Sequence, residues 1–212
     1  MTPLYPAMLD LTAVPILVVG GGQVALRKVK GFLAGGGRPD LIAPTIVPEL
    51  AGMAGPAGLV HRAGRFLEGD TRGYRIVVAA TDSRDVNARV GAEARANGAW
   101  VNVVDDPTAS NLTVPATVRE ADVLVSLSTG GASPLLARRL RARLETLVTP
   151  GLGRAAGRIH AARAAVRARW PDDEQRRRSF WFSLITDEFL DLAIAGNDEE
   201  VESRIESCLS RS

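Results

Sequence analysis

The chain has 212 residues, enough for one large domain or for a medium domain with a smaller partner. Hydrophobic residues make up 46% of it and the formal net charge is only +2, a balance that fits a globular core and gives no sign of a nucleic-acid partner. Its lone cysteine, Cys208, excludes an internal disulfide and a thiolate metal cluster, so we expect a cytoplasmic protein. A signal-peptide pattern and a membrane-spanning apolar run are both lacking, so we expect no membrane partner.

The first half of the chain alternates strand-like and helix-like segments. An apolar, β-branched run at 13–19 predicts a buried strand, and an amphipathic helix follows at 23–33. Further strand-like runs lie at 40–43, 59–62, 75–80 and 100–104, with helices expected at 47–53 and 83–97. Such alternation predicts parallel β-α-β units, so we expect the α/β class and a Rossmann-like, doubly wound parallel sheet over residues 1–112.

The second half follows a different pattern. Strand-like runs at 112–118 and 121–127 predict an antiparallel hairpin, joined by Arg119 and Glu120. Ser133 and Pro134 then open a helix, and the remaining pattern is helical. We therefore predict a dimerisation hairpin and helix over 113–148 and a helical C-terminal domain over 149–212. Because the hairpin has no place in the parallel sheet and exposed edges invite pairing, we expect a homodimer.

Charge is unevenly spread over the helical region. The segment from Arg138 to Arg178 contains twelve arginines and four acidic residues. The segment from Asp187 to the end contains eight acidic residues and two arginines. Such a run of charge usually marks a solvated helix face.

The strongest local motif is the glycine loop between the first strand and the first helix. Gly20, Gly22 and Ala25 fit G-x-G-x-x-A, with Gly20 allowing a tight turn and Gly22 a close approach of a pyrophosphate to the backbone. The helix start would hold the phosphates. A glycine turn that binds nothing is the alternative. The acid expected about 20 residues later is missing, so the motif does not choose between NAD and NADP.

Two acidic positions lie where predicted strands end, at the rim that binds ligands in such sheets. Thr81 and Asp82 follow the fourth strand. One interpretation is that they contact a cofactor, and the other is that Asp82 caps the next helix. Asp105 follows the fifth strand, and a carboxylate there can act as a general base, with a turn or capping role as the alternative. A second glycine turn, at Gly130 and Gly131, precedes a helix. It either binds an anionic group at the helix start or is a plain tight turn.

Four blocks together resemble the precorrin-2 dehydrogenase family, which is also the N-terminal module of siroheme synthase. The matching blocks, in chain order, are VVGGGQVALRK at 18–28, AATDSRDVN at 79–87, NVVDDP at 102–107 and STGGASPLLARR at 128–139. A later run at 176–181 is similar to the C-terminal helical region of that family. The length leaves no room for the methyltransferase module of the fused enzyme, so we expect the stand-alone form.

This resemblance implies NAD-dependent oxidation of precorrin-2 to sirohydrochlorin by an intertwined homodimer, with iron insertion in some members. It implies that Asp105 is catalytic and that NAD contacts Gln23, Val24, Pro44 and Thr45. With the positions from the motifs above, the expected cofactor-binding set also includes Gly20, Gly22, Thr81 and Asp82. For a substrate with eight carboxylates, we expect contacts from a set in the third and fourth blocks: Asn102, Ser128, Thr129, Gly130, Gly131 and Arg138. Thr129 stands where the family often has serine, so the phosphorylation site of the fused enzyme is changed.

The sequence features also bear on two alternative functions. A nucleotide-sensing regulatory module would need the glycine loop without Asp105 or an arginine-rich surface. A short-chain alcohol dehydrogenase is excluded, because neither Tyr5 nor Tyr74 has a lysine four residues later. Since the only histidines are His61 and His160, we expect no metal site and weak or absent chelatase activity.

Overall fold

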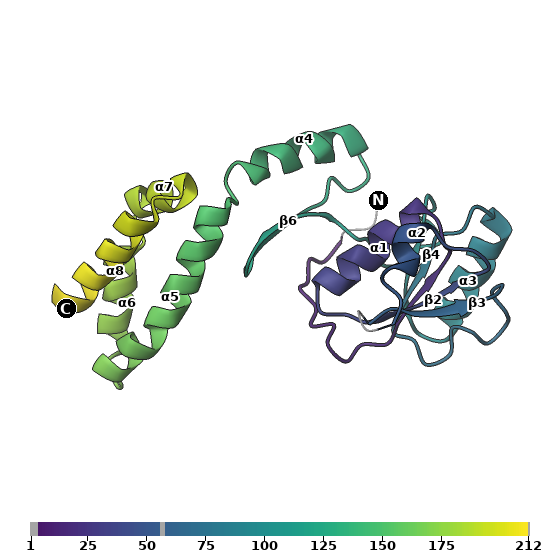
Figure 1. Ribbon diagram of the computed structural model, residues 1–212, viewed down its shortest axis with the longest axis horizontal. Coiled ribbons are helices and arrows are strands. Elements are labelled where there is room, and N and C mark those ends of the chain that lie inside the picture. The colour runs from purple at the N-terminus through teal and green to yellow at the C-terminus, as the bar shows by residue number, and fades with distance from the viewer. Residues whose placement is uncertain (1–3, 56–57, 212) are drawn as a thin grey trace. The chain divides into compact units, whose positions relative to one another are not determined.

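The chain folds into two compact units, which meet in the sequence between Val114 and Pro115. The computed structural model describes residues 4–55 and 58–211 (Figure 1). Each unit is described by itself below. No helix in these described ranges is long and apolar enough to cross a membrane.

The first unit is a five-stranded parallel sheet in the order β3-β2-β1-β4-β5. Its strands are β1 (Ile16–Val19), β2 (Pro39–Ala43), β3 (Val60–Ala63), β4 (Ile76–Ala79) and β5 (Trp100–Val103). Its helices are α1 (Gln23–Ala34), α2 (Pro48–Ala51) and α3 (Arg84–Ala96). The predicted Rossmann-like, doubly wound sheet is confirmed. β1 is shorter than expected because Pro15, just before it, has no N–H to donate to the ladder.

Alternate residues of the buried strands supply two cores, one on each face of the sheet. Ile16 and Val18 of β1 pack with α1 and α2, whereas Leu17 and Val19 pack with α3. All four are essentially inaccessible to solvent, and burial of each such side chain contributes roughly 1.5–3 kcal/mol. The continuous apolar runs in the sequence thus correspond to strands covered on both faces.

The second unit begins with an antiparallel hairpin, β6 (Ala116–Glu120) and β7 (Val123–Leu127). The hairpin prediction is confirmed, but the turn predicted at Arg119 and Glu120 is wrong. Both residues belong to β6, and Glu120 pairs directly with Val123, so the turn is Ala121 and Asp122. Ala121 adopts a φ of +49°, a left-handed conformation that two-residue hairpin turns require.

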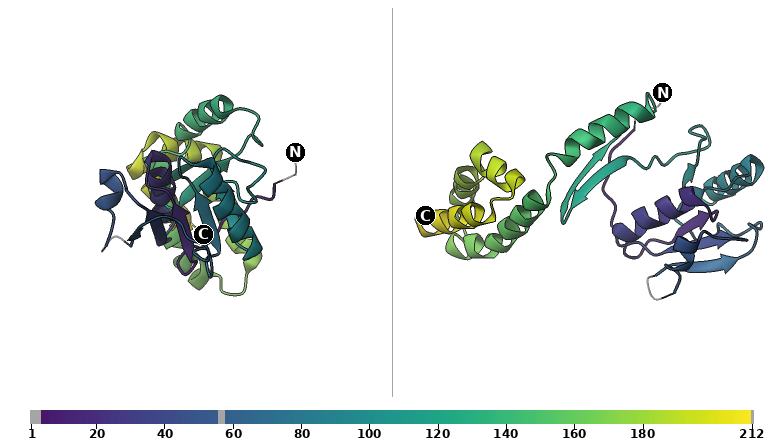
Figure 2. Two further views of the ribbon diagram at one scale, coloured as in Figure 1. Left: turned by 90° about the vertical axis from the view of Figure 1, so that its right-hand side faces the viewer. Right: turned by 45° about the horizontal axis from the view of Figure 1, so that its top comes forward.

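Helices complete this unit: α4 (Pro134–Glu145), α5 (Pro150–Arg169), α6 (Glu174–Leu184), α7 (Asp187–Ala195) and α8 (Asp198–Arg211). The last four share a core that includes Val166, Leu184, Phe189 and Val201. α4 lies against the hairpin, as Figure 2 shows, and none of its residues is buried.

Ion pairs join the basic and acidic parts of the helical region. Arg158 of α5 pairs with Asp198 (3.2 Å) and with Glu202 (2.6 Å) of α8, and Arg154 pairs with Asp198 at 2.7 Å. Exposed pairs of this kind contribute at most about 1 kcal/mol each. Part of the uneven charge seen in the sequence is therefore balanced within this unit.

A carboxylate on α3 anchors the loop before β4. Glu93 accepts hydrogen bonds from the N–H of Gly69 (3.0 Å), the N–H of Thr71 (3.0 Å) and the Thr71 hydroxyl (2.7 Å). Partial burial acts to raise the pKa of Glu93, but these hydrogen bonds outweigh it, and the net pKa is lowered. A lowered folded-state pKa means that ionised Glu93 stabilises the fold above its unfolded pKa of about 4.3.

We therefore expect Glu93→Gln to lower the free energy of unfolding at pH 7 by about 1 kcal/mol, since a charged acceptor is lost. The deficit should shrink as the pH falls through the lowered pKa of Glu93, because the wild-type carboxylate is then protonated too. Urea unfolding at several pH values measures this. The exposed Glu68→Gln is the matched control, and an equal loss in both variants would contradict the assignment.

Candidate functional site

The first two glycines of the loop between β1 and α1 are fixed by close packing. Gly20 has a φ of +129°, and a Cβ there would lie 2.2 Å from the carbonyl oxygen of Ala80, just after β4. A Cβ on Gly21 would lie 1.9 Å from the carbonyl oxygen of Thr45, just after β2. The N–H of Val47 also donates to the Gly21 carbonyl at 2.9 Å. Any larger residue would push the ends of β2 and β4 away from the loop.

Gly22 differs from its two neighbours. It is the N-cap of α1 with an ordinary φ of −87°, and nothing lies within 4 Å of the position that a Cβ would take. No described side chain caps α1, and its first turn holds no acid. Other helix starts do have side-chain caps, namely Ser83, Ser133, Thr149, Asp173 and Thr186. The first N–H groups of α1 and their partial positive charge are thus available to an anion.

Residues around this helix start come from two segments. Gln23 is exposed and Val24 is partly buried against the core on the α1 face. Pro44 and Thr45 are exposed directly after β2, where the Thr45 backbone contacts the loop. The structure therefore brings the predicted cofactor positions at 20–24 and 44–45 to one place on the carboxyl edge of the sheet. Ala25 is fully buried, as close helix–strand packing requires.

Thr81 and Asp82 follow β4 at the same edge. The Thr81 hydroxyl donates to Asn87 Oδ1 (2.7 Å), and Asn87 in turn donates to the Thr81 carbonyl (2.9 Å). Asp82 is exposed and does not cap α3, because Ser83 occupies the N-cap and accepts from the N–H of Val86 at 3.3 Å. The capping alternative for Asp82 is therefore wrong. Its cofactor contact stays a prediction.

Asp105 follows β5 in a conformation that few residues adopt. Its φ is +60°, in the left-handed region where Asp and Asn are enriched among non-glycine residues. Its side chain is exposed, and in the described part of the chain it has neither a hydrogen bond nor an ion pair. An unpaired carboxylate at the carboxyl edge of the sheet is free to meet a ligand.

Asp106 has a different environment from its neighbour. Its Oδ1 accepts from the Thr108 hydroxyl (2.7 Å), the Thr108 N–H (3.0 Å) and the Ala109 N–H (2.9 Å). The hydrogen bonds from Thr108, first its hydroxyl, and from Ala109 hold the pKa of Asp106 below its ordinary value. Asp106 therefore shapes the loop, while Asp105 is left exposed. The Asp-Pro-Thr spacing is the sequence signal for this turn.

Asn102 lies within β5, on the opposite face from its neighbours Val101 and Val103. Its Nδ2 donates to the Leu112 carbonyl at 3.0 Å, and its Oδ1 is buried without a protein partner. This oxygen is the one buried side-chain polar atom among the described residues that lacks a hydrogen-bond partner. A substrate contact for Asn102 stays a prediction.

The remaining predicted substrate residues belong to the second unit. Gly130 and Gly131 have φ values of +62° and +85°, and the Ser128 hydroxyl accepts from the N–H of Gly130 at 3.2 Å. Thr129 accepts at its carbonyl from the N–H of Ala132 at 3.1 Å, and Arg138 is exposed on α4. Residues 128–132 form a tight turn before α4, and Ser133 caps that helix.

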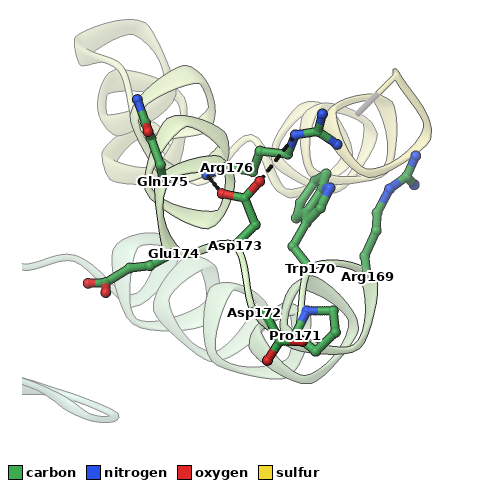
Figure 3. A pocket seen from close by; sticks show the side chains of 8 residues that line it. All are labelled: Arg169, Trp170, Pro171, Asp172, Asp173, Glu174, Gln175 and Arg176. Carbon is green, nitrogen blue, oxygen red and sulfur yellow. Dashed lines mark hydrogen bonds and ion pairs between the residues drawn. The ribbon is translucent and has the colours of Figure 1, made fainter.

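A surface hollow also occurs in the second unit, at the turn between α5 and α6 (Figure 3). Its lining includes Arg169, Trp170 and Asp173, and Asp173 caps α6 through the N–H of Arg176 (2.9 Å). It is an open, charged turn with none of the predicted site residues. Across the described residues, no group of three or more His, Cys, Asp or Glu is placed to hold a metal.

Family models match the chain in three consecutive segments. A "Putative NAD(P)-binding" model matches residues 7–116, just over half of the chain. Models described as "Sirohaem biosynthesis protein central" and "Sirohaem synthase dimerisation region" match residues 125–147 and 151–209. The chain is thus a Rossmann-fold protein of the NAD(P)-binding class.

Individual proteins give the same picture. The siroheme synthase of Chromobacterium violaceum is 41% identical over 95% of the chain, and that of Gluconobacter oxydans is 37% identical over 97%. The chain spans only 43% and 44% of these relatives. A solved structure, "SirC, precorrin-2 dehydrogenase", is 27% identical, with a TM-score of 0.79 over 96% of this chain and 100% of that one. The chain belongs to the precorrin-2 dehydrogenase and siroheme synthase family, as its four sequence blocks predicted.

The open space beside Gly22 leads to a prediction. Gly22→Asp should abolish binding of the dinucleotide and leave the fold intact, because the new carboxylate enters open space at an anion site. Calorimetric titration with NAD and circular dichroism measure the two effects. Gly22→Ala is the control for bulk, and Gly21→Ala should unfold the loop because its Cβ meets the Thr45 carbonyl. Native NAD affinity in Gly22→Asp would rule this loop out.

Proposed function

We propose that the chain is an NAD-dependent dehydrogenase that oxidises precorrin-2 to sirohydrochlorin in siroheme or modified tetrapyrrole biosynthesis. Likeness to siroheme synthases and to a precorrin-2 dehydrogenase along nearly the whole chain supports this activity. The Rossmann edge described above supports the class of reaction. We place the protein in the cytoplasm, where its lone cysteine stays reduced.

The glycine loop fits a dinucleotide on its own geometry. Gly20 and Gly21 hold the loop against the ends of β4 and β2, while the Gly22 position and the uncapped start of α1 stay open. In the proposal these N–H groups bind the pyrophosphate, and Thr45 and Pro44 adjoin the adenosine half. Neither an acid nor an arginine stands at 44–48, directly after β2, to select by charge, and NAD is proposed from the family likeness. When bound, NAD supplies the hydride acceptor.

Asp105 is the proposed catalytic residue. Oxidation of precorrin-2 removes a hydride and a proton, and the carboxylate accepts the proton and stabilises positive charge on the tetrapyrrole. Its exposure, and the lack of a partner among the residues that the structure describes, leave both oxygens free for this task. The neighbouring Asp106 is less suited to this task, because hydrogen bonds from Thr108 and Ala109 to its Oδ1 hold its carboxylate in the loop.

The observation that carries the proposal is the position of these two features on one edge. Val19, Ala79 and Val103 are aligned across β1, β4 and β5, and each is the last residue of its strand. Strands lie about 4.8 Å apart, so the loop after β1 and the turn after β5 are separated by about 10 Å across the sheet. A ligand bound at the carboxyl edge can contact both.

Anion recognition by the second unit is also part of the proposal. The turn at 128–131 precedes the positive end of α4, and arginines follow on α4. Arg138 and its neighbours would attract a substrate that carries many carboxylates. The proposal is limited to dehydrogenation, and weak or absent metal insertion stays a sequence-based prediction.

A regulatory module that only senses a nucleotide is the competing function. It accounts for the open start of α1 but assigns no task to the unpaired, left-handed Asp105. Incubation of the protein with precorrin-2 and NAD, followed by absorption of the tetrapyrrole and of NADH, decides between the two. Absence of both spectral changes would favour the sensor.

Asp105→Asn should lower kcat by about 10²–10⁴, the usual contribution of a general base, with little change in NAD affinity or melting temperature. Asn tolerates the left-handed backbone, so the charge is removed without added strain. Asp105→Ala should lose as much activity and also some stability. Asp106→Ala is the matched control: its melting temperature should fall, with a smaller loss of turnover. Near-native turnover in Asp105→Asn would refute the catalytic role.

We also propose a homodimer formed through the hairpin and α4. Both edges of the β6–β7 ribbon are unpaired within residues 4–55 and 58–211, and α4 buries no residue. Leu135 and Leu136 of α4 are 50% and 46% exposed. The match of residues 151–209 to a dimerisation region supports self-association.

Light scattering at micromolar concentration should give twice the chain mass. Leu135→Glu with Leu136→Glu should shift the protein toward monomer, because two charges would enter the apolar contact while glutamate suits the first turn of a helix. Leu67→Glu, at an exposed leucine of the first unit, is the control and should stay dimeric. A wild-type monomer would overturn the proposal.

A further inference from the structure

Asp105 owes its conformation to a four-residue turn at the end of β5. The N–H of Asp106 donates to the carbonyl of Val103 at 3.2 Å, which closes the turn around Val104 and Asp105. A positive φ at the third residue of such a turn is typical of type II geometry, in which glycine or asparagine is preferred. Asp105 therefore adopts a conformation that costs free energy and needs support from its surroundings.

Ser110 provides that support at both ends of the turn. Its hydroxyl oxygen accepts from the N–H of Val103 at 2.9 Å and donates to the carbonyl of Asp106 at 2.8 Å. A hydroxyl has one hydrogen to donate, so its approach to the Val103 carbonyl at 3.2 Å is the weaker contact. One side chain thus fixes the first residue of the turn relative to the last.

The intervening loop holds this hydroxyl in place. The Asp106 carboxylate binds Thr108 and Ala109 and so directs the chain back toward β5. One residue after Ser110, the Asn111 Oδ1 accepts from the N–H of Val101 at 2.6 Å. Ser110 and Asn111 therefore cap two N–H groups along the same outer edge of β5, but only Ser110 contacts the turn.

We infer that Ser110 is a positioning residue: its hydroxyl bridge from Val103 to Asp106 keeps Asp105 left-handed and its carboxylate in one exposed place at the strand end. Loss of the bridge lets the turn relax to ordinary backbone angles and moves the carboxylate. The catalytic consequence rests on the proposed function, whereas the effect on the turn does not.

The test compares Ser110→Ala with Ser110→Thr and Asn111→Ala, all assayed well below their melting temperatures. Ser110→Ala should lower kcat about tenfold with an unchanged KM for NAD, because misplacement of a reacting group by 1 Å can cost up to about a hundredfold. Ser110→Thr keeps the hydroxyl and should restore most of kcat. Asn111→Ala loses an edge bond of the same kind, so its melting temperature should fall while its kcat stays near wild type.

A double variant separates positioning from general loosening. In an Asp105→Asn background, Ser110→Ala should cause no further fall in kcat, because residues that act through one group are not additive. Equal falls with and without the Asp105 carboxylate would overturn the inference, as would full kcat in Ser110→Ala. Inactivity of the wild-type protein toward precorrin-2 would instead count against the proposed function.

A crystal structure of Ser110→Ala provides a readout that needs no substrate. The φ of Asp105 should leave the left-handed region, or the 103–106 turn should show more than one conformation. An Asp105 that keeps a φ near +60° in one ordered conformation would overturn the inference whatever reaction the protein catalyses.

Discussion

The organisation of the carboxyl edge depends on one steric constraint, the close approach of the glycine loop to two strand ends. Gly20 touches the backbone after β4 and Gly21 touches the backbone after β2, at separations that exclude a Cβ. These contacts set where α1 begins, and so where its free N–H groups lie. They also align β1 with β4, and through β4 with the end of β5 that carries Asp105. The space beside Gly22 can receive a ligand because Gly20 and Gly21, packed against backbone, hold the loop in place.

The sequence was sufficient for the architecture of the first unit and for the family. Continuous apolar runs predicted the central strands β1 and β4, whose two faces are both covered, and the glycine motif predicted where α1 starts. The sequence was insufficient for the roles of residues whose contacts come from segments distant along the chain. The motif gives Gly21 no assigned role, although Gly21 makes the tightest contact, because Thr45 reaches it only after β2 has joined the sheet. The capping role of Ser83 instead of Asp82 depends on where α3 begins, which propensity leaves uncertain by a residue or two.

The hairpin turn shows another reason for error. Arg119 and Glu120 are polar, as turn residues often are, but they continue β6 and leave the turn to Ala121 and Asp122. Alanine rarely adopts a left-handed conformation, so the sequence does not mark Ala121 as a turn residue. The turn position follows from the strand register, in which Glu120 pairs with Val123. Likewise, no local sequence pattern indicates a role for Ser110. Its hydroxyl reaches Val103 and Asp106 only because the chain returns to β5 after Asp106.

The left-handed backbone of Asp105 also bears on how such a protein can change during evolution. Asparagine and glycine, the residues best suited to that conformation, are each a single-base substitution away from an aspartate codon. Most other replacements would strain the turn and be removed through loss of stability. In the proposed function, the accessible route away from catalysis therefore leaves a folded chain that keeps its nucleotide-binding loop. A family built on this turn would be expected to produce pseudoenzymes, stable copies that keep the fold and its ligand while the chemistry is lost.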